Sequence, residues 1–298
     1  PPTTAMQPQG GRAGTGGFFV SPSSSHRLYY ETWAPTHCAP KAACVFLVGV
    51  HESADTECVM RLAAAYKQAG LTFICLEHHA HGRSDGKPMG LVQSWDLLCK
   101  HACEFFGHVT TLSPSGKVFV SGHSMGGGIL ACVSQSLMEQ HPSRFGGAVL
   151  ISPALSTPPI PWITEKALSL VCHVAPWAPL GPADDPEGGM APDLAKQYRD
   201  SPHNYLGGMR LRTGKMFLDV FRRLDVEMGA GRFTTPFPYL ILHGDADGTC
   251  ELSTSQRVIA CSSSRDKGLV VLKGRGHQPV CEEGYQEVLS ASVNWVNA

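Results

Sequence analysis

Ser124 stands in the middle of Gly122-His123-Ser124-Met125-Gly126, which fits the pattern G-x-S-x-G. A serine in this pattern is typical of a nucleophile on a sharp turn between a strand and a helix. A Cβ two residues before or after the serine would collide with the neighbouring element, so both positions need glycine. The apolar run 118–120 and the helical sequence 128–133 supply the required strand and helix. We therefore predict that Ser124 is a nucleophile.

A serine hydroxyl is a weak nucleophile near neutral pH, so Ser124 needs a histidine base and an acid that fixes the tautomer of this base. On turns of this kind the partners follow in the order serine, acid, histidine. His277 follows a predicted strand at 269–272 and is the candidate base. Asp245 and Asp247 follow a predicted strand at 239–242 and are the candidate acids.

Attack on an ester carbonyl creates a negative oxygen, which needs two N–H donors. The amide of Met125, the residue after the nucleophile, is the natural first donor. The second should come from the loop after the predicted strand 44–50, which reads His51-Glu52-Ser53-Ala54.

The segment from Glu77 to Gly86 is rich in histidine, a common metal ligand. We interpret it as a turn whose polar side chains satisfy buried backbone groups, with Gly82 and Gly86 supplying the bends. We therefore expect no metal at this segment.

Composition narrows the class of function. The chain has 298 residues, 43% hydrophobic content and a formal net charge of −1. It lacks the basic footprint of a nucleic-acid-binding protein, so we expect no nucleic-acid partner. The eleven cysteines are scattered without a C-x-x-C pair, which favours reduced thiols and a cytoplasmic location. No apolar run is long enough to span a bilayer, and we expect residues 1–17 to be flexible.

The predicted elements place these residues on one sheet. Two short β-type segments, 17–20 and 28–33, predict an antiparallel hairpin at a sheet edge. Apolar strands and helices then alternate, which is typical of a parallel sheet covered on both faces. The predicted strands are 44–50, 71–76, 118–120, 148–151, 239–242 and 269–272, and the predicted helices are 55–69, 91–106, 252–260 and 285–296.

The alternation stops between about 153 and 233. This interval starts rich in proline and continues through an apolar helical face between Trp162 and Trp177. We predict a helical cap, inserted between two strands and placed over the sheet edge where ligands of such folds bind. Its apolar side chains exceed what docking needs, so some should face an acyl chain or a lipid surface, with reversible membrane contact.

Four ordered motifs resemble those of the monoglyceride lipases and their lysophospholipase-like relatives. They are G-H-S-M-G-G at 122–127, H-A-H-G-R-S-D-G at 79–86, H-G-D-A-D at 243–247 and G-R-G-H at 274–277. Residues 198–202 and 210–214 also look like segments of the family's cap. The resemblance implies an α/β-hydrolase fold from residue 18 to 298, no cofactor, and hydrolysis of the ester bond of a lipid, monoacylglycerol.

The resemblance also implies site residues. The acid is the last residue of H-G-x-x-D, so the role falls on Asp247, with Ser124 and His277 as its partners. Where the family has H-G-x-G-E-H, this chain has His51-Glu52-Ser53-Ala54-Asp55-Thr56, which puts the second oxyanion donor at the amide of Ser53 beside that of Met125. The alternatives are a general carboxylesterase, a lysophospholipase, or a ligand-binding protein of this fold without catalysis.

Overall fold

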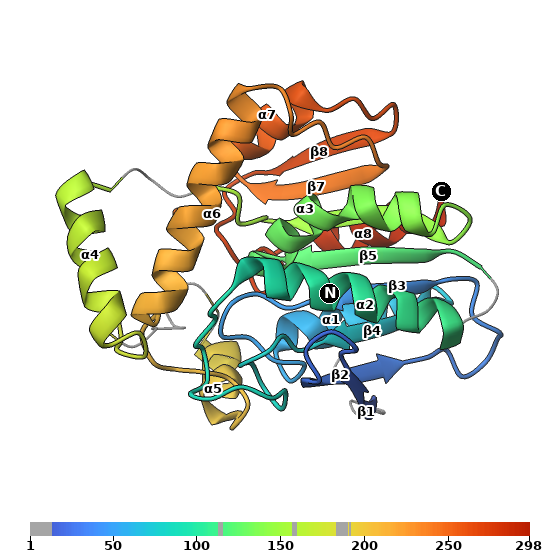
Figure 1. Ribbon diagram of the computed structural model, residues 1–298. Helices are drawn as coiled ribbons and strands as arrows, with labels where there is room; N and C mark the ends of the chain where they lie inside the picture. Colours follow the sequence, from blue (N-terminus) through green and yellow to red (C-terminus); the bar gives the residue numbers. More distant parts are fainter. Residues whose placement is uncertain (1–13, 113–115, 157–159, 183–189, 191) are drawn as a thin grey trace, which may run out of the picture.

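The computed structural model describes residues 14–112, 116–156, 160–182, 190 and 192–298. A single eight-stranded sheet crosses the molecule in the order β1-β2-β4-β3-β5-β6-β7-β8 (Figure 1). The strands are β1 (Thr15–Val20), β2 (Arg27–Trp33), β3 (Ala43–Leu47), β4 (Thr72–Leu76), β5 (Val118–His123), β6 (Phe145–Ile151), β7 (Tyr239–Gly244) and β8 (Lys267–Leu272). β2 is antiparallel to both of its neighbours, β1 and β4, and all other neighbours are parallel.

Both faces of the sheet are covered by helices, as the apolar strands predict. The helices are α1 (Glu57–Gln68), α2 (Trp95–Leu112), α3 (Met125–Gln140), α4 (Trp162–Val174), α5 (Pro192–Asp200), α6 (Leu211–Gly229), α7 (Leu252–Cys261) and α8 (Gln286–Asn297). Successive side chains of a strand point to opposite faces. In β3, Val45 and Leu47 pack in the core shared with α2 and α3, while Cys44 and Phe46 pack in the core shared with α1 and α8. This arrangement is the α/β-hydrolase fold, which confirms the predicted fold class.

The predicted hairpin is present, but it begins earlier than expected. β1 pairs with β2 from Thr15 onward, inside the segment 1–17 that the sequence assigns to a flexible head. Its backbone therefore forms a strand from Thr15. Residues 1–13 of that segment lie outside the described residues.

The interval between β6 and β7 is an insertion that carries α4, α5 and α6. In Figure 1, α4 stands away from the sheet and α6 lies between α4 and the rest of the molecule. α6 belongs to both parts, because its later side chains Leu224 and Met228 are buried in the main core. In the ranges that the structure describes, this insertion holds helices and one isolated bridge, Pro179 to Arg210.

The start of α6 is fastened to the core by polar contacts. The Thr213 hydroxyl donates to the Gly90 carbonyl at 2.7 Å and accepts from the Val92 amide at 2.9 Å. Arg210 Nε donates to the Met89 carbonyl at 2.6 Å. The segment 210–214, singled out in the sequence, is therefore the junction between cap and core.

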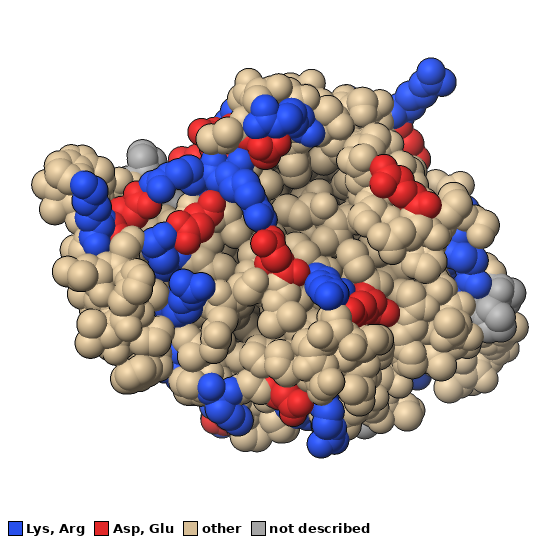
Figure 2. Space-filling view, viewed as in Figure 1, with Lys and Arg blue, Asp and Glu red and all other residues tan. Residues whose placement is uncertain are grey.

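The visible surface carries charges of both signs without separation. Figure 2 shows Lys and Arg interspersed with Asp and Glu on this face. Ion pairs join neighbouring helices, such as Arg222 of α6 with Glu165 of α4, and Arg223 of α6 with Asp96 of α2. Within the described ranges, each helix is too short or too polar to cross a lipid bilayer.

Candidate active site

The backbone at Ser124 has the strained conformation that the sequence pattern predicts. β5 ends at His123, α3 begins at Met125, and Ser124 between them has φ 50° and ψ −113°. A Cβ on Gly126 would lie 2.1 Å from the Leu47 carbonyl oxygen, and one on Gly122 would lie 2.6 Å from the Gly126 carbonyl carbon. Only glycine fits at either position, so the turn packs tightly against the end of β3.

His277 and Asp247 meet Ser124 in one hydrogen-bonded chain. His277 Nε2 lies 2.9 Å from Ser124 Oγ, and His277 Nδ1 lies 2.9 Å from Asp247 Oδ2. The three residues come from the ends of β5, β7 and the loop after β8, which share one edge of the parallel sheet. The structure thus brings together the serine, acid and histidine that the sequence selects.

The Asp247 carboxylate is held by several donors. Its side chain is fully buried, and Oδ1 accepts the amides of Thr249 at 2.8 Å and Cys250 at 2.9 Å. Burial works against the charge, but hydrogen bonds from His243 and His277 hold the pKa of Asp247 well below its usual range. A carboxylate that stays charged fixes His277 in the tautomer with its proton on Nδ1, so Nε2 can accept the serine proton.

Burial also lowers the pKa of His277, although the hydrogen bond to Asp247 opposes this change. The imidazole is therefore neutral, and a base, over the physiological range. Asp245 is a different kind of carboxylate. It is exposed, accepts the Gly274 amide at 2.6 Å and pairs with Lys273 at 3.2 Å, on the surface of the loop.

Ser53, whose amide is the predicted second oxyanion donor, is a buried residue of the loop after β3. Its buried hydroxyl donates to Asn204 Oδ1 at 2.6 Å, and Ser53 is not among the described residues that line the cavity at Ser124. Val50 does line that cavity. The family pattern H-G-x-G-E-H fits this loop three residues earlier, as Val48-Gly49-Val50-His51-Glu52-Ser53, with Gly49 and Glu52 in their expected places. The position of the donor then falls on Val50, while Met125 stays beside Ser124 at the start of α3.

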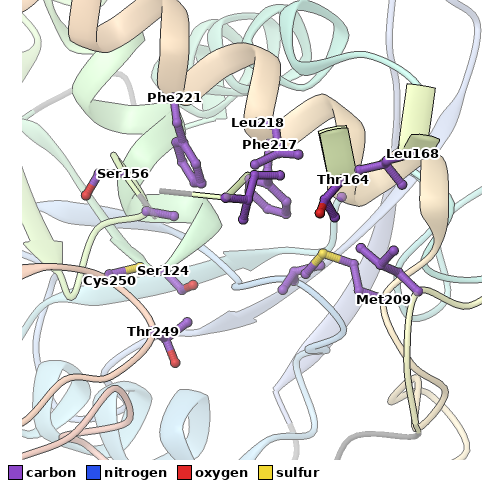
Figure 3. Close-up of a pocket in the computed structure, with 15 residues that line it drawn as sticks. Ser124, Ser156, Thr164, Leu168, Met209, Phe217, Leu218, Phe221, Thr249 and Cys250 are labelled. Carbon is purple, nitrogen blue, oxygen red and sulfur yellow. The ribbon is translucent and has the colours of Figure 1, made fainter. Parts of the chain in front are cut away.

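A mostly apolar cavity opens above Ser124 and encloses about 410 Å³. Figure 3 shows Phe217, Leu218 and Phe221 projecting from α6 toward the cavity, with Leu168 and Met209 toward one end. Thr249 and Cys250 border the opposite side, near Ser124. Fifteen of the described residues line the cavity, and none of these is charged: Val50, Ser124, Ala154, Ser156, Ile160, Thr164, Leu168, Leu180, Met209, Gly214, Phe217, Leu218, Phe221, Thr249 and Cys250.

Three polar residues near the site are not predicted as site residues from the sequence. His243 is buried, lies 3.3 Å from Asp247 Oδ2 through Nε2, and accepts the Ser255 hydroxyl at Nδ1. Glu52 and His123 are buried and bonded to each other. Each stands beside or inside a motif singled out above, but the sequence offers no signal that side chains from different loops meet.

In the histidine-rich turn, a polar side chain satisfies buried backbone groups, as the sequence suggests. Glu77 accepts the amides of Ala54 and Arg83 and pairs with the Arg83 guanidinium at 2.7 Å. Gly82 has φ 52°, and a Cβ there would lie 2.1 Å from the Glu77 carboxylate. Among the described residues, no group of three or more His, Cys, Asp or Glu side chains is arranged to hold a metal ion.

Comparison with known proteins agrees with this geometry. Residues 38–284 match the family described as "Serine aminopeptidase, S33". The chain is 29% identical to the monoglyceride lipase of Mus musculus over 91% of this chain and 86% of that one. It is 25% identical to the monoacylglycerol lipase of Mycolicibacterium smegmatis over 91% and 92% of the two chains.

The fold is similar to that of solved structures. A soluble variant of the monoglyceride lipase from Saccharomyces cerevisiae superimposes with a TM-score of 0.81 and 17% identity, covering 98% of this chain and 97% of the other. Because the family match spans most of the sequence, including all three residues of the hydrogen-bonded chain, the protein belongs to the serine aminopeptidase S33 family, as a carboxylic ester hydrolase related to the monoglyceride lipases.

Proposed function

We propose that this enzyme cleaves the ester bond of monoacylglycerols to a free fatty acid and glycerol, through an acyl-enzyme intermediate on Ser124. The observation that carries the proposal is the cavity that opens on Ser124 and is walled by the cap, because the described residues of its lining are uncharged and largely apolar. Cavities of this kind bury a hydrocarbon chain, and monoglyceride lipases are among the relatives that the chain resembles over most of its length.

The first half of the reaction transfers the acyl group to Ser124. The Oγ atom attacks the ester carbonyl while His277 Nε2, 2.9 Å away, removes its proton. The imidazolium that forms is stabilised by the buried Asp247 carboxylate at Nδ1. The amides of Met125 and Val50 are the donors that we assign to the carbonyl oxygen as it becomes negative. His277 then protonates the glycerol oxygen, and glycerol leaves.

The second half returns the enzyme to its starting state. A water molecule takes the place of glycerol, and His277 removes one of its protons as the water attacks the acyl carbonyl. The same two amides stabilise the second negative oxygen. When the intermediate breaks down, His277 gives the proton to Ser124 Oγ and the fatty acid is released.

The absence of charge among the described cavity residues favours a glycerol headgroup over a phosphate-bearing one. Apart from Ser124, the polar side chains among the described lining residues are the hydroxyls of Ser156, Thr164 and Thr249. A bound lysophospholipid would bury its phosphate in this cavity without a cationic partner among the described residues. Burial of an unpaired charge costs free energy. Lysophospholipids and short acyl esters are the competing substrates in the test.

Acyl-chain length tests the proposal directly. Each methylene that enters the cavity contributes about 0.8 kcal/mol, so kcat/KM should rise about fourfold per CH₂ until the cavity is filled. Gly214 lies on the cavity wall, and a Cβ added there would lie 3.0 Å from the Leu180 side chain. The variant Gly214→Leu should therefore lower kcat/KM for long acyl chains and spare short ones.

Gly229→Ala is the matched control, since it lies in the same helix but outside the cavity lining, with Arg257 at an ordinary contact distance of 3.5 Å. A wild-type enzyme that prefers acetyl esters, or that hydrolyses lysophospholipids faster than monoacylglycerols, would contradict the substrate assignment. A flat chain-length profile in wild type would also contradict it.

We also propose that the outer face of α4 touches lipid surfaces reversibly, in a protein that works in the cytoplasm. Trp162, Leu170 and Val174 of this helix are 66%, 72% and 76% exposed. Exposed apolar groups on an amphipathic helix favour the membrane interface. The eleven cysteines are free thiols, as a reducing compartment requires. Co-sedimentation with phosphatidylcholine vesicles should fall in a Trp162→Gln, Ile163→Gln variant, and equal sedimentation would contradict the proposal.

A further inference from the structure

A buried pair of side chains, Glu52 and His123, lies directly behind the reacting residues. Glu52 Oε1 is 2.9 Å from His123 Nδ1, and the two side chains are 4% and 2% exposed. Glu52 Oε2 accepts the amide of Gly49 at 2.6 Å. On the other side of the ring, His123 Nε2 is 2.9 Å from the carbonyl oxygen of His277.

The partners fix the protonation of this pair. A carboxylate faces His123 Nδ1 and a backbone carbonyl faces Nε2, and both groups are hydrogen-bond acceptors. The ring satisfies both only if both of its nitrogens carry protons, which makes it an imidazolium. Burial disfavours that charge, but the Glu52 carboxylate outweighs it and raises the pKa of His123 to about 9.

The Glu52–His123 pair connects the three chain segments that carry the reacting groups. Gly49 precedes Val50, whose amide we assign to the oxyanion, and His123 precedes Ser124. The carbonyl that His123 holds belongs to His277 itself. On the basis of the proposed function, we propose that the Glu52–His123 ion pair is a positioning unit, which sets the His277 backbone and the oxyanion loop relative to Ser124 without touching substrate.

The ion pair also acts on the base through space. The rings of His123 and His277 are 5.1 Å apart, so the imidazolium makes protonation of His277 less favourable. Asp247 and Glu52 act in the opposite direction, and the effect of Glu52 on the pKa of His277 is smaller than that of His123. Neutralising the pair should therefore raise the pKa of His277.

Two substitutions at Glu52 separate position from charge. In Glu52→Gln, the amide oxygen accepts the Gly49 amide and the amide nitrogen donates to a neutral His123, which still donates to His277. This variant keeps the hydrogen bonds and loses the charges. Glu52→Ala loses both, so its kcat should fall about 100-fold, the order expected when reacting atoms move by about 1 Å. Glu52→Gln should lose less, and the acid limb of its pH profile should move to higher pH.

The control removes a different buried hydrogen bond. Ser292→Ala breaks the 2.6 Å contact with Tyr66, which lies in the core between α1 and α8. This control should lower stability and leave kcat and the pH profile unchanged. Rates are measured as fluorophosphonate labelling of Ser124 and as hydrolysis of a simple acyl ester, so the result does not depend on monoacylglycerol being the substrate.

Nitrogen NMR of histidine-labelled enzyme gives a second readout, with the signal assigned by loss in His123→Gln. His123 should carry protons on both nitrogens at pH 7 and titrate near pH 9. A neutral His123 at pH 7 would overturn the ion pair. Equal kcat losses in Glu52→Ala and Ser292→Ala, or wild-type kcat in Glu52→Ala, would overturn the positioning role.

Discussion

Replacing Asp247 by asparagine changes one atom of the site, and the structure fixes which way the new amide must face. The amides of Thr249 and Cys250 both donate to Oδ1 of Asp247. In Asp247→Asn they keep the amide oxygen on their side, so the NH₂ group faces His277 Nδ1. A donor there forces Nδ1 to accept, and the ring proton moves to Nε2, where it points at Ser124.

His277 in that tautomer cannot take the serine proton, and its cation has lost the buried carboxylate. Loss of the acid in a triad of this kind costs about 10⁴ in kcat, equivalent to about 5.5 kcal/mol in activation free energy. Asp245→Asn is the matched control, because the exposed Asp245 still accepts the Gly274 amide through its amide oxygen and loses only the contact with Lys273. Its kcat/KM should stay near that of wild type.

The assay is ester hydrolysis at pH 8 together with the rate of fluorophosphonate labelling, and circular dichroism checks the fold of each variant. Asp247→Asn should lose both activities, while Asp245→Asn keeps both. If Asp247→Asn retained more than a tenth of the wild-type rate, or Asp245→Asn lost as much as Asp247→Asn, the tautomer argument would be refuted.

The same geometry leads to three more expected outcomes. Ser124→Ala should abolish hydrolysis and labelling while keeping the fold, because the missing oxygen is the atom that forms the bond; residual turnover of a few per cent in pure protein would exclude this nucleophile. Since burial lowers the pKa of His277, the acid limb of kcat/KM should lie below pH 6.5, the ordinary value for histidine, with activity rising as His277 loses its proton; a limb above pH 7 would contradict the burial argument. Burial lowers the pKa of His78 to about 3 and that of His81 to about 4, so the unfolded chain binds more protons than the folded one as pH falls below 6.5. Urea titrations should therefore show about 2 kcal/mol less stability at pH 5 than at pH 6, and equal stability at both would show that these histidines are not buried neutral.

The parallel part of the sheet could be predicted because its strands are buried on both faces. Such strands read as unbroken apolar runs, and the helices between them keep their periodic patterns. The hairpin before them is a local structure, so its turn residues were enough to place it. The ends of elements are less certain from sequence: α2 continues through Gly107 to Leu112, because Val109 of its second half is buried under the main core.

The oxyanion loop shows how the end of a strand affects where a motif is placed. The apolar run 44–50 predicts a strand that ends at Val50, but β3 ends at Leu47. A strand three residues too long moves the following loop three residues too late, so the pattern H-G-x-G-E-H is placed on His51 instead of Val48. A Cβ on Gly49 would lie 2.9 Å from the Glu52 carboxylate, and this close approach favours glycine at 49 and a pattern that begins at Val48.

The contact between Glu52 and His123 could not be predicted from the sequence, for a different reason. Its members come from segments about seventy residues apart, and the contact exists because β3 and β5 are neighbours in the sheet. Strand order along a parallel sheet depends on which crossover connections pack together. No local pattern in the sequence states that order.

The position of α6 means that bond cleavage and substrate preference depend on different residues. Gly214, Phe217 and Phe221 of this helix line the cavity, and Phe217 also packs in the main core, where Leu224 and Met228 further along are buried. The three residues of the hydrogen-bonded chain all lie outside the 153–233 insertion, on loops of the sheet. Mutations in the cavity-lining residues of α4 and α6 can therefore change the shape of the cavity. They leave Ser124, Asp247 and His277 unchanged. A mutant library limited to these lining residues should therefore yield variants that prefer other acyl chains and keep the same catalytic residues.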